Sequence, residues 1–74
     1  MTVHLGNCDG RSIRIETAQR DDGMYVVRAV HVEVRMEDEV IIDQMPYVGM
    51  AHVDEAEVVA IATIEARAYA LSRF

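Results

Sequence analysis

Apolar and polar residues alternate along the first part of the chain and take a helical spacing along the last part. Between Ser12 and Gln19, Ile13, Ile15 and Thr17 occupy one side of the alternation, and charged residues occupy the other. A period of two residues is that of a strand with one buried face. This segment is therefore expected to be the first main strand of a sheet.

A second and longer strand is expected from Met24 to Met36, where β-branched residues are frequent. It follows Arg20-Asp21-Asp22-Gly23, in which Asp-Gly predicts a type I′ hairpin turn because both central positions need a positive φ. The two strands should therefore pair antiparallel. Arg28 interrupts the apolar side of the second strand, which predicts a bulge or an edge location there. The expected core side of this strand carries Met24, Val26, Val30, Val32, Val34 and Met36.

The remaining sheet segments are shorter. Glu37 to Glu39 is expected to be an acidic turn, followed by a third strand from Val40 to Met45 that ends before Pro46. Either face of this third strand could be the buried one. Residues 1–10 are expected to be a flexible or edge segment, with Thr2 to Leu5 as a short edge strand at best and a turn at residues 7–10. The sequence thus predicts three antiparallel strands, or four with the edge strand.

The last part of the chain has helix signals. Asp54 can act as the N-cap, with Glu57 in the acidic position of a capping box, and the helix is expected to run from Glu55 to about Ser72. Packed on the sheet, it would complete one α+β domain over residues 1–74. A second, weaker apolar stripe (Val58, Ala62 and Tyr69) predicts flanking loops or a partner. The face expected to make the core carries Ala60, Ile61, Ile64, Ala68 and Leu71.

Composition narrows the function classes. The chain has 74 residues, 51% of them hydrophobic and 27% charged, which is typical of one small globular core. Its net charge of -6 repels a phosphate backbone, so binding of nucleic acid is disfavoured. The single Cys8 has no disulfide partner within the chain, which fits a reducing compartment. No signal-peptide pattern or membrane-length apolar run is evident, so we expect a cytoplasmic protein that does not enter a membrane.

Few residues suggest chemistry. Metal-ligand residue types occur at His4, Cys8, His31 and His52, but without the paired close spacings of a zinc site. No neighbouring base is evident for Cys8 as a nucleophile, and no phosphate-binding loop or nucleophile elbow occurs. We therefore expect no metal, no cofactor and no enzymatic activity. A small enzyme is the third-ranked alternative, which a pocket with converging polar groups would favour.

An interaction surface is the leading expectation. If one helix covers one face of the sheet, the other face is partly apolar, and the second helix stripe adds further apolar surface. This predicts a non-enzymatic module that binds a protein partner or forms a homodimer or larger homo-oligomer. The residues expected on its interaction surface are Tyr25, Val27, Ala29, His31, Val58, Ala62 and Tyr69.

A family resemblance rests on three segments: Gly10 to Ile15, the hairpin from Arg20 to Val27, and Pro46-Tyr47 leading to Asp54-Glu55-Ala56. With these, the chain resembles small bacterial proteins of unknown function built as three strands and one helix, which implies a fold but no activity. It is more weakly similar to HicB-type antitoxins, which have a partial ribonuclease-H fold. Their Pro-Gly-Cys segment is replaced by residues 46–49 here. That resemblance implies the second-ranked alternative, an antitoxin-like regulator of a toxin–antitoxin system.

Overall fold

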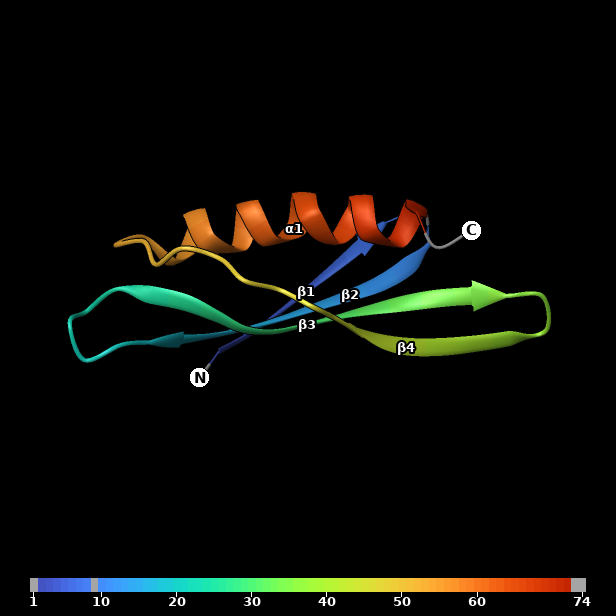
Figure 1. Ribbon diagram of the computed structural model, residues 1–74, viewed down its shortest axis with the longest axis horizontal. Coiled ribbons are helices and arrows are strands. Elements are labelled where there is room, and N and C mark those ends of the chain that lie inside the picture. Colours follow the sequence, from blue (N-terminus) through green and yellow to red (C-terminus); the bar gives the residue numbers. More distant parts are fainter. Residues whose placement is uncertain (1, 9, 73–74) are drawn as a thin grey trace.

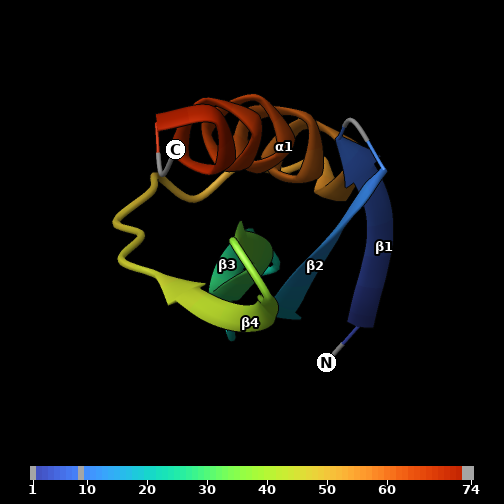
Figure 2. The same cartoon turned by 90° about the vertical axis from the view of Figure 1, so that its right-hand side faces the viewer.

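The computed structural model describes residues 2–8 and 10–72, which form four strands and one helix. All neighbouring strands pair antiparallel in the order β1-β2-β3-β4. The sheet curls around the helix, which lies across one of its faces (Figure 1 and Figure 2). The expected α+β fold with one C-terminal helix is confirmed in its four-stranded form. The elements are β1 (Thr2–Cys8), β2 (Arg11–Gln19), β3 (Tyr25–Met36), β4 (Glu39–Met45) and α1 (Glu55–Ser72).

The N-terminal strand is longer than its sequence suggests. β1 has seven residues and pairs with β2 along its whole length, from Thr2 opposite Thr17 to Cys8 opposite Arg11. A turn was expected at residues 7–10, but Asn7 and Cys8 belong to β1, Asp9 lies outside the described residues, and the described turn residue is Gly10. Gly10 has a φ of 80° there, and its N–H donates to Asn7 Oδ1 at 3.0 Å. Glycine suits this position because it has no Cβ to oppose a left-handed backbone.

The hairpin between β2 and β3 differs in turn type from the expectation. The Gly23 N–H donates to the Arg20 carbonyl at 3.0 Å, and Gly23 has a φ of 86°. Among the described non-glycine residues only Glu37 has a positive φ, so Asp22 does not, and the type I′ expectation is wrong. The turn is of the type I kind followed by a left-handed glycine. Asp22 Oδ1 stabilises it by accepting the Met24 N–H at 3.0 Å.

The expected bulge at Arg28 is confirmed. Glu16 is opposite Ala29 and Thr17 is opposite Val27, so Arg28 is the extra residue in β3. Because side chains alternate between faces, one extra residue changes which of them face the helix. Val30, Val32 and Val34 are buried as expected, but beyond the bulge Val27, and not Val26, packs against the core. The side chain of Met36 lies outside what the structure describes.

The helix begins and ends as expected, but the face it buries is not the expected one. Ile64 is 69% exposed and Leu71 is 55% exposed, so the predicted core stripe is wrong. Small side chains face the sheet instead and let the two backbones approach closely. The core is formed by Cys8, Ile13, Ile15, Val30, Val32, Val34 and Met45 of the sheet together with Val58, Ala62, Ala66 and Ala70 of the helix.

Both ends of α1 are capped. Asp54 Oδ1 accepts the Ala56 N–H at 3.0 Å, which confirms Asp54 as the N-cap. The last turn of α1 contains no basic residue among those described. Arg11 of β2 caps this end of the helix instead, since its Nη1 donates to the Ala70 carbonyl at 3.0 Å. A guanidinium at this end also faces the negative pole of the helix dipole.

Candidate interaction surface

The outward face of α1 carries an apolar stripe of Ala60, Ile64, Ala68 and Leu71, called the outer helix stripe below. All four residues are exposed, Ile64 and Leu71 by 69% and 55%. They lie one turn apart in succession and therefore share one face of the helix. None of the described segments lies over this face (Figure 1 and Figure 2). The stripe faces away from the sheet.

Two apolar stripes on one helix are more than this fold uses. A helix that covers one sheet normally has one apolar face and one polar face. In α1 the inward face holds Val58, Ala62, Ala66 and Ala70, all buried, and the outward side carries the outer helix stripe beside exposed charged residues. Fully burying a large aliphatic side chain contributes about 1.5–3 kcal/mol. Because Ile64 and Leu71 are exposed, the fold does not gain this free energy from either of them. A partner that covers them would gain it.

The loop before the helix extends this apolar surface. Val48, Met50 and Val53 are 100%, 80% and 78% exposed. Met50 and Ile61 line a shallow hollow between the loop and α1. The loop therefore adds exposed apolar side chains beside α1.

Tyr47 gives the loop its shape. A Cβ at position 49 would lie 2.5 Å from the Tyr47 ring, so only glycine allows the observed approach. Burial raises the pKa of Tyr47 above its ordinary value of 10.0, and the negative charge of Glu65 adds to the effect. The tyrosine ring thus holds the loop close to the middle of α1.

Of the residues expected on the interaction surface, the two small helix residues are buried. Val58 is 2% exposed and Ala62 is 0% exposed, so neither can contact a partner. Tyr69 lies on the same side, packs against the core and donates to Asp43 Oδ2 at 2.7 Å. These expectations fail because α1 is turned so that its alanine side, and not its isoleucine side, faces the sheet.

Two of the expected strand residues are also displaced from the open sheet face. Val27 packs against the core beyond the bulge. Tyr25 is half-buried, and its backbone exchanges hydrogen bonds of 2.7 and 3.1 Å with His52. The bulge at Arg28 accounts for both, because it moves the residues before it to the other face. The expected set of surface residues is therefore not one surface.

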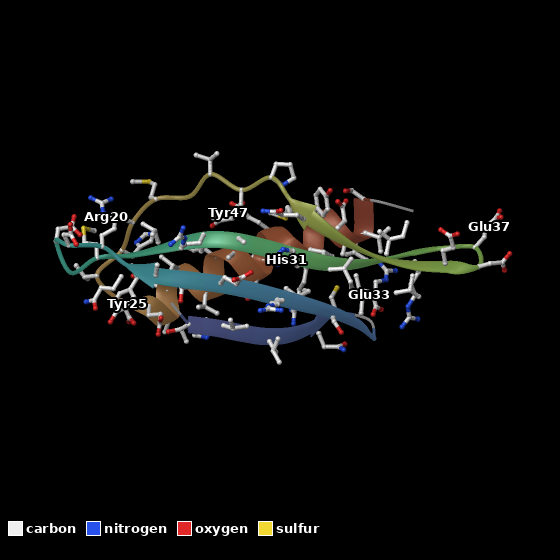
Figure 3. The ribbon with its side chains drawn as sticks, turned by 90° about the horizontal axis from the view of Figure 1, so that it is seen from below. Arg20, Tyr25, His31, Glu33, Glu37 and Tyr47 are labelled. Carbon is white, nitrogen blue, oxygen red and sulfur yellow. The ribbon has the colours of Figure 1, made fainter. Side chains whose placement is uncertain are left out.

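Ala29 and His31 do lie on the sheet face away from the helix, since Val30 between them points into the core. His31 is labelled near the centre of that face in Figure 3, and its Nδ1 is 3.4 Å from Glu16 Oε2. Leu5 and Ile42 are exposed here by 81% and 59%, but they lie on opposite edge strands.

Polar residues of the two central strands, β2 and β3, lie between Leu5 and Ile42. Arg14 and His31 lie in the cross-strand row that begins at Leu5. The open sheet face thus mixes polar and apolar side chains, because Arg14, His31 and Glu33 line the same hollow as Leu5 and Ile42, whereas the outer helix stripe consists of apolar side chains alone. The helix offers the better apolar docking surface.

One polar cluster joins the sheet to the start of the helix. Thr17 Oγ1 donates to Glu55 Oε2 at 2.9 Å, and His4 Nε2 lies 3.4 Å from the same hydroxyl and 3.7 Å from Glu55 Oε2. A hydroxyl, an imidazole and a carboxylate are the groups of a catalytic triad. Thr17 is completely buried, however, so no substrate can reach its hydroxyl. The cluster links β1, β2 and α1 mechanically.

Residues 2–8 and 10–72 contain no group of three or more histidine, cysteine or acidic side chains placed to hold a metal ion. The helix in the described part of the chain, α1, is not long and apolar enough to cross a membrane.

Comparisons with protein-family models, with curated proteins and with solved structures find no match to this chain. The resemblances to three-strand-plus-helix proteins and to HicB-type antitoxins therefore stay predictions from the sequence.

Proposed function

We propose that this chain is a non-enzymatic module that self-associates through the outer helix stripe. The observation that carries this proposal is the exposure of Ile64 and Leu71, 69% and 55%, on a helix whose other face is already buried. Covering them removes apolar surface from water, which contributes roughly 25 cal/mol per Å².

The size of the chain also supports self-association. A domain of 74 residues buries a small fraction of its surface and has a thin margin of stability. Binding to the folded state alone raises the free energy of unfolding, so a second copy would stabilise the fold. The helix contributes mostly alanine to the core, which leaves its larger side chains to contribute at an interface.

Sedimentation velocity across a concentration series tests the proposal, with Ile64→Glu as the disrupting variant. Position 64 would carry a charge in the middle of the interface, which strongly disfavours association. Ile42→Glu is the matched control, because Ile42 is 59% exposed on the open sheet face and undergoes the same change. We expect Ile64→Glu to be monomeric and Ile42→Glu to associate as the unaltered chain does. The reverse pattern would contradict the proposal and indicate the sheet face.

A further inference from the structure

Two residues of opposite charge lie beside the outer helix stripe. Glu57 lies one turn before Ala60, and its side chain is 59% exposed. Arg67 lies one turn beyond Ile64 and is also exposed. Glu57 and Arg67 are ten positions apart, which is about 15 Å along a helix. The stripe is thus flanked by a negative charge toward one end and a positive charge toward the other.

Among the described residues, neither of these two charges has a close ion-pair partner. The nearest cationic partner of Glu57 is His52 Nδ1 at 3.9 Å, a long contact. Arg67 has no ion pair with any described side chain. Both charges are therefore free to meet opposite charges on another molecule.

We propose that two copies of the chain pack α1 against α1 in antiparallel orientation, with Glu57 of each copy beside Arg67 of the other. This inference rests on the proposed function and adds the orientation and register of the contact. A two-fold axis at the level of Ala62 generates both charge pairs. A parallel arrangement would place Glu57 against Glu57 and Arg67 against Arg67, which is repulsive.

The same register matches side-chain sizes. It places Ile64 of one copy opposite Ala60 of the other, so that a large side chain meets a small one. Leu71 then lies opposite Val53, which is 78% exposed just before the helix. An 18-residue helix is about 27 Å long, and such a contact is smaller than the roughly 800 Å² per partner of a standard interface. Association is therefore expected at micromolar rather than nanomolar concentration.

Charge exchange between the two positions tests the register. Glu57→Arg makes both cross-pairs positive, and Arg67→Glu makes both negative, so each variant alone should associate roughly tenfold more weakly. Mixing the two variants, or combining both changes in one chain, restores opposite charges at every cross-pair. We expect a 1:1 complex in the mixture and dimers of the double variant. Circular dichroism of each dilute variant checks that it is folded.

Glu39→Arg and Arg28→Glu are the controls, because both positions are exposed away from α1 and undergo the same charge changes. Their association should match that of the unaltered chain. If Ile64→Glu abolishes association but charge exchange gives no rescue, the antiparallel register is overturned while self-association through the stripe stands. If the unaltered chain is monomeric throughout, the proposed function itself fails. A complex only with a different protein would overturn both.

Discussion

The Thr17 hydroxyl on β2 donates a hydrogen bond of 2.9 Å to the Glu55 carboxylate at the first residue of α1. The two residues are 38 positions apart in the chain, so this bond fixes where the helix begins above the sheet. Thr17 is also the one polar residue in the described core, with 0% exposure. Such a buried donor is costly to leave unpaired, which explains why it has a partner.

Thr17→Val should lower the free energy of unfolding by about 1 kcal/mol, because it removes this bond and keeps the volume of the side chain. Urea denaturation measures the change. Thr17→Ser keeps the hydroxyl and isolates the bond from the lost methyl group. Equal or higher stability of the valine variant would show that the bond does not hold the helix start.

The orientation of the helix predicts different responses at two alanines. Ala66 is completely buried against the sheet, and Ala68 is exposed on the outer helix stripe. Ala66→Leu should destabilise the fold by roughly 1–3 kcal/mol, since the enlarged side chain forces the helix away from the sheet. Ala68→Leu, measured in dilute solution, should change stability little. The opposite ranking in thermal denaturation would mean that the isoleucine side faces the sheet.

The cap supplied by Arg11 predicts a local effect. Arg11→Met keeps the apolar stem of the side chain but removes the donor to the Ala70 carbonyl and the charge at the helix end. We expect a loss of about 1–2 kcal/mol and faster amide exchange in the last turn of α1. Arg14→Met, on the same strand but the other face, should have little effect. Unchanged exchange at the helix end would contradict the capping role.

Tyr47 predicts a pH dependence at the alkaline end. Because burial and Glu65 raise its pKa in the folded chain above the ordinary 10.0, the unfolded chain loses this proton first as the pH rises. The contribution of Tyr47 to stability is therefore fully present below about pH 10 and is lost as the pH passes through the raised pKa. Glu65→Gln should lower the pKa of Tyr47.

Ultraviolet titration of phenolate formation measures this, with Tyr47→Phe identifying which transition belongs to Tyr47. If Glu65→Gln leaves that transition where it was, Glu65 does not act on the ring. Gly49→Ala should also move the transition toward pH 10, because an added Cβ would push the ring out into water.

Much of the fold could be predicted from local pattern. The alternation of Ile13, Ile15 and Thr17 and the capping signals around Asp54 are short-range features, and the structure confirms the strand and the helix bounds. The bulge at Arg28 was also predictable, because a charged residue interrupted an apolar series. The full length of β1 was not, since Gly6 and Asn7 have low strand propensity and are held there by pairing with β2.

The rotation of the helix could not be predicted from the sequence alone. Both of its faces carry an apolar stripe, so periodicity did not distinguish them, and the larger side chains of Ile64 and Leu71 favoured the wrong one. Tertiary contacts decide which face of α1 is buried: the alanines allow the helix to approach the sheet closely, and Tyr69 reaches Asp43 only from the inner side. The expected surface residues Val58 and Ala62 failed for the same reason. The unbroken four-residue spacing of Ala62, Ala66 and Ala70 was the signal that could have shown the close-packed side.

Sedimentation velocity of the unaltered chain beside Ile64→Glu tests the central claim most directly. From about 1 to about 100 µM, the unaltered chain should pass from monomer to dimer, and Ile64→Glu should remain monomeric with an unchanged circular dichroism spectrum. A single monomeric species for both proteins at every concentration would contradict the account of the outer helix stripe.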